Sequence, residues 1–323
     1  MNRAKEEEPA PEEPGADVLL LTVTLMASIS WMFSKEAVSL MPPLLFVAIR
    51  FLLAGSLLAL AGWRQLRLLS AEQVRRAMVV GLFFGTAMCC WIMGLHFSSH
   101  IGVGAFLTSL AVVLVPVFGR LAFAERAPAS TWLALPVAVA GLALLSLEGG
   151  FSLEAGQLFF VAAAVIFAFY FNLNTHAANH GTVTDVSGNT RHREKVPALA
   201  LTTVVLWTVG ALASAASLTL ETWPPLESLM LPSLAGWVAA SAIIGTAGRF
   251  FIQTYAQSLS PNSHGVVIMV VEPVWTALMA AAWFGERMSL VQLAGCALIF
   301  TALLVNRWRA LRALLKTLLA RTA

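Results

Sequence analysis

Residues 255–287, YAQSLSPNSHGVVIMVVEPVWTALMAAAWFGER, decide how the rest of the chain is interpreted. The stretch begins polar, continues as an apolar run of helix length, and ends in Gly285, Glu286 and Arg287. The apolar run is interrupted once, by Glu272 and Pro273. A helix of ~20 apolar residues can cross the ~30 Å hydrocarbon core of a bilayer. The stretch therefore predicts a membrane span with one carboxyl group inside it.

A second stretch, residues 94–126, shows the same punctuation, although its sequence identity to the first is low. It begins polar, runs apolar with one proline, and ends in a small residue and a charge pair. A shift of 161 positions superposes Ser99 on Ser260, Gly104 on Gly265, Glu125 on Glu286 and Arg126 on Arg287. The shared pattern predicts that the chain consists of two related halves.

Composition assigns the chain to the membrane. Hydrophobic residues make up 59% and charged residues 11% of the chain, whereas a soluble domain carries roughly 25% charged residues. The net charge of +3 does not indicate nucleic-acid binding, because the charges lie between apolar runs and form no basic groove. The three cysteines lie inside apolar runs and give neither a disulfide framework nor a zinc-binding spacing.

Ten apolar segments follow an acidic, proline-rich N-terminal tail. We expect each to be a membrane-spanning helix, because the bilayer core offers no water to the backbone. The expected spans are 17–38, 43–62, 77–97, 101–123, 131–147, 157–175, 197–219, 235–257, 262–284 and 289–306. They define a disordered cytoplasmic tail (1–16), two five-helix repeats (17–147 and 157–306) and a basic interfacial tail (307–323). Residues 176–196 are predicted to form a solvated linker.

The positions of lysine and arginine predict the orientation. With both termini in the cytoplasm, the inner segments hold fifteen Lys and Arg residues and the outer segments hold one, Arg287. This asymmetry is a strong positive-inside signal. Five spans are an odd number, so the second half must enter the membrane inverted relative to the first. Inverted repeats are a recurrent plan of secondary transporters, whose substrate site lies near the midplane between the halves.

Over residues 17–306 the chain resembles the drug/metabolite transporter superfamily, and within it the EamA-like ten-helix exporters. The resemblance rests on short motifs in a specific order: Trp31 and Lys35, Pro42 and Pro43, Ala48 to Phe51, Gly94 to Ser99, Val112 to Pro116, Glu125 and Arg126, Leu259 to Pro261, Val271 to Val274, Gly285 to Arg287, and Gly295. It implies an all-α integral membrane fold of ten transmembrane helices in two inverted repeats. It also implies export of amino acids, other metabolites or drugs. The chain departs from the family at His96 and His100, where glutamine and a small residue are usual.

Glu272 is the leading candidate for coupling or substrate binding. It lies about ten residues into its span, near the membrane midplane. Low dielectric favours the protonated form of a carboxyl group, which would let Glu272 take up and release a proton. The structural alternative is an ion pair with Arg249, Arg50 or Lys35.

Further polar side chains are candidates because ionisable groups within spans are costly. Arg249, Gln253 and Gln257 are four residues apart and share one helix face, which predicts a cavity or a partner helix beside them. The 161-residue shift places Gln257 on His96, so we hypothesise that both approach one central cavity from opposite leaflets.

The first and sixth spans offer aromatic residues beside polar ones. Trp31 and Lys35 are four residues apart and would suit an organic substrate with a carboxylate, although Lys35 could instead extend to the interface. Tyr170 occupies what looks like the corresponding place in the sixth span. For Arg50 we keep two alternatives, an anion-binding role and an ion pair with Glu36 or Glu272.

These features predict a secondary transporter of the bacterial inner membrane that exports a small metabolite by alternating access. Uptake, facilitated diffusion and, more remotely, a membrane-embedded enzyme or a sensory protein are alternatives. No nucleotide-binding or hydrolase motif is present. No cofactor or metal is predicted, because a Cys89, Met93, His96 and His100 stripe would extend over more than about 16 Å of helix. The expected partners are a small-molecule substrate and the lipid bilayer, for a monomer or homodimer.

Overall fold

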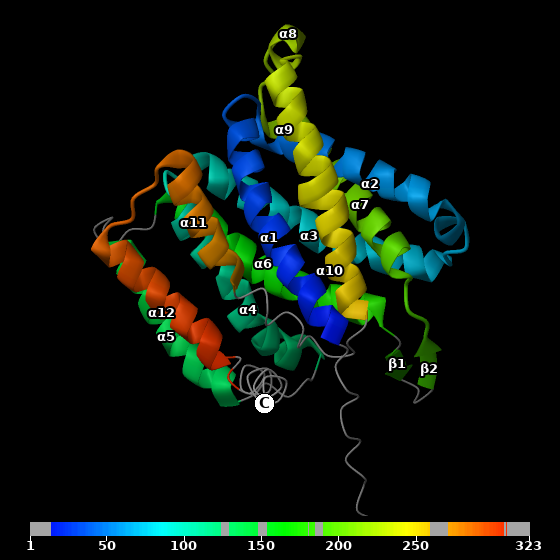
Figure 1. Ribbon diagram of the computed structural model, residues 1–323. Helices are drawn as coiled ribbons and strands as arrows, with labels where there is room; N and C mark the ends of the chain where they lie inside the picture. The colour runs from blue at the N-terminus through cyan, green and yellow to red at the C-terminus, as the bar shows by residue number, and fades with distance from the viewer. Residues whose placement is uncertain are drawn as a thin grey trace, which may run out of the picture.

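The computed structural model describes residues 14–123, 129–147, 154–179, 181–184, 190–258, 271–306 and 308. Within these residues the chain is almost entirely helical (Figure 1). The first half comprises α1 (Pro14–Val38), α2 (Pro43–Arg67), α3 (Ala71–Phe97), α4 (Ile101–Phe123) and α5 (Ala129–Leu147). The second half comprises α6 (Ala155–Ala178), α7 (Ala198–Leu220), the short α8 (Leu226–Leu229), α9 (Pro232–Ala242), η1 (Ile243–Gly248), α10 (Arg249–Ser258), α11 (Glu272–Phe284) and α12 (Leu290–Asn306).

Among the described residues, six helices are long and apolar enough to cross a membrane, and two shorter apolar helices accompany them. The six are α2, α3, α4, α6, α7 and the continuous rod of α9, η1 and α10. The helical turns within this rod widen at η1, a π-helix. Within the ninth predicted span, helix α11 begins at Glu272. Pro273 occupies its first turn, where a missing N–H costs no intrahelical hydrogen bond.

The segment predicted as a solvated linker contains a short antiparallel hairpin. Strand β1 (Gly181–Thr184) pairs with β2 (Thr190–Arg193), with Gly181 opposite Arg193. Both ends of this connection are tied to the start of α3. After β2, Gln73 donates to the carbonyl of Lys195 at 2.9 Å and Arg76 donates to the carbonyl of Glu194 at 2.8 Å. Before β1, Arg76 also donates to the carbonyl of Ala177 at 3.3 Å.

The helices pack as two halves that exchange equivalent elements. Helices that hold the same position in the two halves are counterparts. The second helix of the first half, α2, packs along its counterpart α7, and the last helix of the first half, α5, packs along its counterpart α12 (Figure 1). The packing of α3 against α6 is matched by that of the α9–α10 rod against α1. Such exchanges are expected of repeats related by a two-fold axis. Helices α5 and α12 can approach closely because Gly141 has no side chain. A Cβ atom there would lie only 2.8 Å from the Gly295 carbonyl oxygen.

Two glutamates of the second half cap helices of the first half. Glu221, after α7, accepts hydrogen bonds from the backbone N–H groups of Leu44 at 2.7 Å and Leu45 at 3.0 Å. Glu286, after α11, accepts from Ile101 at 2.9 Å and Gly102 at 3.2 Å. A carboxylate at a helix N-terminus satisfies orphan donors and complements the helix dipole. The conspicuous Glu286 of the sequence pattern therefore joins the two halves at the start of α4.

Glu286→Ala is expected to lower the free energy of unfolding by about 1–2 kcal/mol, the usual size of a lost N-terminal cap. Thermal unfolding of the purified protein in one detergent measures the effect. Glu227→Ala is the matched control, because Glu227 is an exposed glutamate on the same half. Equal unfolding temperatures for Glu286→Ala and wild type would contradict a capping contribution.

Candidate functional site

A cavity lies at the centre of the bundle, with walls from both halves. It is lined from the first half by α1, α2, α3 and α4, and from the second half by α6, α10 and α11. Its lining is mainly aromatic and aliphatic, with a smaller set of polar residues: Ser30, Arg50, Thr108, Ser109, Arg249, Gln253 and Glu272. Concave apolar sites with a few convergent polar groups are the usual form of a small-molecule site.

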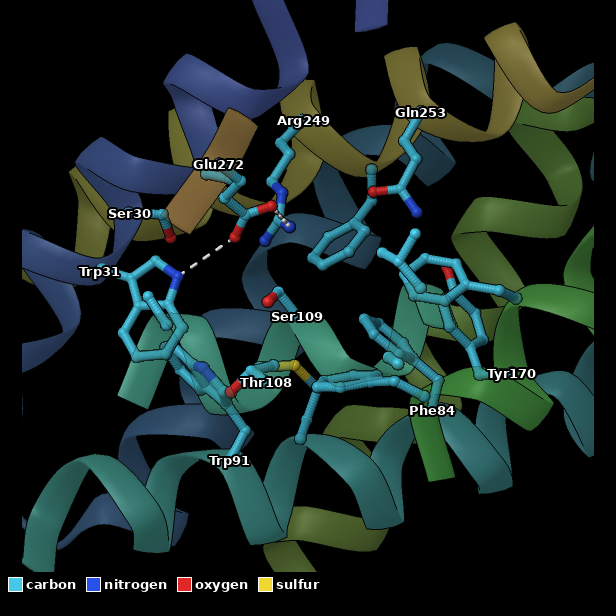
Figure 2. Close-up of a pocket in the computed structure, with 18 of the residues that line it drawn as sticks. Ser30, Trp31, Phe84, Trp91, Thr108, Ser109, Tyr170, Arg249, Gln253 and Glu272 are labelled. Atoms are coloured by element: carbon cyan, nitrogen blue, oxygen red, sulfur yellow. Dashed lines mark hydrogen bonds and ion pairs between the residues drawn. The ribbon is translucent and has the colours of Figure 1, made fainter. Parts of the chain in front are cut away.

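Glu272 is held between two partners from different helices (Figure 2). One carboxylate oxygen accepts a hydrogen bond from the Trp31 indole N–H at 3.2 Å. The other lies 3.4 Å from an Arg249 guanidinium nitrogen, in an ion pair whose side chains are 16% and 14% exposed. The Glu272 backbone carbonyl accepts from Ser28 at 3.2 Å, which joins the start of α11 to α1. The carboxylate is therefore fixed at the cavity wall where three helices meet.

Arg50 is a buried cation bound entirely by neutral groups. Its side chain is 1% exposed. It donates to the hydroxyls of Ser30 at 2.7 Å and Ser34 at 2.8 Å, to the carbonyl of Gly245 at 3.1 Å, and to the hydroxyl of Thr246. Gly245 and Thr246 belong to η1, so this π-helical segment directs a backbone carbonyl and a hydroxyl toward the guanidinium. Short π-helical segments are often found at functional sites.

Gly245 allows this close approach. A Cβ atom there would lie 2.4 Å from the Ser30 hydroxyl oxygen and 3.4 Å from an Arg50 nitrogen. Any side chain would push η1 away from α1 and from the guanidinium.

Gly245→Ala is therefore expected to destabilise the protein by about 1–3 kcal/mol, the usual cost of overpacking. Gly236→Ala is the control, because a Cβ atom on that helical glycine would meet nothing within 4 Å. It should leave the unfolding temperature unchanged or raise it, since alanine is the better helix former. Thermal unfolding of both variants checks the pair, and similar behaviour of the two would contradict the close packing at η1.

Aromatic rings form the remaining walls. Phe84 stacks on Tyr170 with centroids 4.3 Å apart and meets Phe250 edge-on at 4.8 Å. Trp31 meets Trp91 edge-on at 4.7 Å. Rings in such contact are rigid and apolar, which suits the body of an organic solute.

Two polar side-chain atoms of residues that line the cavity have no hydrogen-bond partner in the described structure. They are the Gln253 amide oxygen and the Arg249 Nε–H group. Gln253 is 1% exposed, and its amide lies on the side of the cavity nearer to Tyr170 (Figure 2). An unpaired buried acceptor and an unpaired buried donor are each costly. A solute with matching groups would remove both costs.

The structure brings together six of the nine residues singled out from the sequence: Trp31, Arg50, Tyr170, Arg249, Gln253 and Glu272. Of the ion-pair alternatives for Glu272, the structure selects Arg249. The alternative of an ion pair for Arg50 with Glu36 or Glu272 is wrong in the described structure. Arg50 binds hydroxyl and carbonyl groups instead, and Glu36 accepts from Trp283 at 3.0 Å.

Three residues singled out from the sequence are not among those lining the cavity. Lys35 donates to the carbonyls of Leu95 at 3.0 Å and Ser98 at 2.9 Å, and so caps the C-terminus of α3. His96 is exposed on α3, against the hypothesis that it approaches the cavity. Gln257 belongs to α10, but its side chain lies outside the described residues.

Sequence reasoning missed most of the aromatic wall and the η1 partner of Arg50. Phe84, Met88 and Trp91 have helical spacing, so one inward face of α3 could have been found. Thr246 gave no such signal, because a π-helical turn has no recognised sequence pattern.

Three comparisons place the chain among known proteins. A model described as the EamA-like transporter family matches twice, over residues 15–147 and 154–308. An uncharacterized transporter from Archaeoglobus fulgidus is 27% identical over 214 residues, which cover 66% of this chain and 68% of that protein. The crystal structure of another protein superposes on this chain with a TM-score of 0.63 and 21% sequence identity. The superposition covers 93% of this chain and 98% of that one. The structural likeness supports the fold alone.

Proposed function

Since this chain belongs to the EamA-like transporter family, we propose that it exports a small organic metabolite across the bacterial inner membrane. In this proposal both termini are cytoplasmic, and the protein works as a monomer or homodimer in the bilayer. The observation that carries the proposal is the Arg249–Glu272 pair at the wall of a cavity shared by both halves. Ionisable groups within a membrane domain are costly, and for that reason they commonly mark a substrate or ion pathway.

Alternating access requires contacts that close one end of the cavity and separate when that end opens. Candidates for such contacts gather at the C-terminal end of α1. Lys35 binds the end of α3, Glu36 accepts from Trp283, and Glu286 caps α4. The last two of these cross between the halves. Rocking one half against the other would break these two contacts and open that end of the cavity.

Coupling to protons would act through Glu272. A proton on this carboxylate would weaken the pair with Arg249 and change which solute the cavity favours. Facilitated diffusion is the simpler alternative, and uptake is the alternative in direction.

The test is an extracellular metabolite profile of cells that overproduce wild type, Glu272→Gln or no transporter. Glu227→Gln is a matched control, because it removes an exposed carboxylate of the same chain. We expect one compound to accumulate outside with wild type and Glu227→Gln, and not with Glu272→Gln present at equal level in the membrane.

Equal export by wild type and Glu272→Gln would support the conclusion that the protein is an exporter and would overturn the coupling role of Glu272. Profiles that all match cells without the transporter would overturn export. Depletion of one compound from the medium by wild type would establish uptake in its place.

A further inference from the structure

The cavity carries more positive than negative charge. Among the described residues that line it, two guanidinium groups, Arg50 and Arg249, accompany one carboxylate, Glu272. Glu272 pairs with Arg249, and the neighbours of Arg50 are all neutral. One positive charge in a region of low dielectric is therefore left without a carboxylate among these residues. A charge in this situation attracts an anion strongly.

We propose that the transported solute is a carboxylate-bearing organic anion, with its carboxylate on Arg249 and its apolar body against the aromatic wall. The inference rests on the proposed transport function and names the substrate class of the same cavity. This substrate class excludes neutral and cationic drug-like solutes, which the aromatic wall alone would fit equally well.

The two arginines have different parts in this recognition. A guanidinium has five N–H donors, and Arg50 already uses four of them on fixed protein groups. Arg50 thus supplies a fixed charge and has little capacity to bind a solute directly. Arg249 makes one long contact with Glu272, at 3.4 Å, and its Nε–H has no partner. Arg249 therefore has donors to offer to a carboxylate.

The rest of the wall fits the body of such a solute. Phe84, Trp91 and Phe250 present apolar surfaces within the cavity that Arg249 also lines. The unpaired Gln253 oxygen would accept a hydrogen bond from a hydroxyl or amino group on the solute. Trp31 stays bound to Glu272 and keeps that carboxylate at the wall.

The test uses full-length protein in lipid nanodiscs and three probes that differ only in their head group: 3-phenylpropionate, 3-phenylpropanol and 3-phenylpropylamine. Isothermal titration calorimetry gives the dissociation constant of each. We expect 3-phenylpropionate to bind roughly 10- to 100-fold more tightly than the alcohol, the range of one charge-assisted hydrogen bond. The amine should bind most weakly.

Two variants shift the cavity charge in opposite directions. Arg249→Gln removes the donor group and should weaken 3-phenylpropionate binding by roughly 10- to 100-fold, to about the level of the alcohol. Glu272→Gln removes the competing carboxylate and should tighten it. General damage to the fold would weaken binding in both variants, so opposite shifts identify the charge effect.

Preferential binding of 3-phenylpropylamine by wild type would overturn the proposal, as would equal binding of all three probes. These results are independent of the metabolite profile. An exported amine would retain the transport function and overturn the anion class. Preference for 3-phenylpropionate without any export would support the anion class and overturn the export function.

Discussion

Arg50→Lys is expected to destabilise the protein by about 2–4 kcal/mol, although it keeps the positive charge. An ammonium is a compact point charge with three donors, and it cannot reproduce the planar fork that binds four groups on two helices. The hydrogen bonds to the Thr246 hydroxyl and to the Gly245 carbonyl would be lost. A hydrogen bond to a charged group contributes about 1.5–3 kcal/mol. The charge would remain buried with fewer hydrogen bonds to compensate its desolvation.

The measurement is the unfolding temperature of the purified variant, which should fall by roughly 3–6 °C for a chain of this size. Arg64→Lys is the control, because Arg64 is an exposed arginine on the same helix, and its change should stay within about 0.5 kcal/mol. If Arg50→Lys unfolds at the wild-type temperature, the hydrogen bonds from Arg50 to η1 do not contribute to the stability of the protein.

The membrane architecture was accessible from the sequence because it depends on composition. Apolar runs of span length and repeated punctuation predicted a ten-helix protein of two halves, and the described helices agree. The ends of the helices were harder to place. Helix α3 begins at Ala71, six residues before the predicted span, because Ser70 and Gln73 form a capping box ahead of the apolar run.

The candidate site could be predicted only where ionisable side chains revealed it. Glu272, Arg249 and Arg50 stood out because charges within spans need partners. Which partner each one takes depends on helix packing, and sequence spacing does not contain that information. Lys35 shows the limit clearly, since its partners are backbone carbonyls at the end of α3.

His96 illustrates a second limit, which concerns helix phase. The repeat shift related His96 to Gln257 by position along the chain, without regard to the direction of either side chain. On α3 the inward face contains Trp91 and Leu95, both buried. Successive residues of a helix are rotated by about 100°, so His96 turns away from that face and is exposed.

The strongest expected effect on function concerns the Arg249–Glu272 pair. Glu272→Gln and Arg249→Gln should each lower the free energy of unfolding by about 1–2 kcal/mol, because each leaves a partly buried charge without its partner. The double variant should regain much of this loss, since two neutral amides can hydrogen-bond across the same gap. Net transport of the solute found in the metabolite profile should fall roughly tenfold or more in all three variants.

This combination separates two roles that each single variant leaves mixed. A pair that only holds α10 to α11 is replaceable, so restoring stability would restore transport. A pair that binds the solute or a proton is not replaceable by amides, so the double variant would be stable and inactive. Unfolding temperatures and initial rates in proteoliposomes, measured on the same preparations, decide between the two. Wild-type rates in the stable double variant would show that the ion pair is structural, and the transport chemistry would then have to lie elsewhere in the cavity.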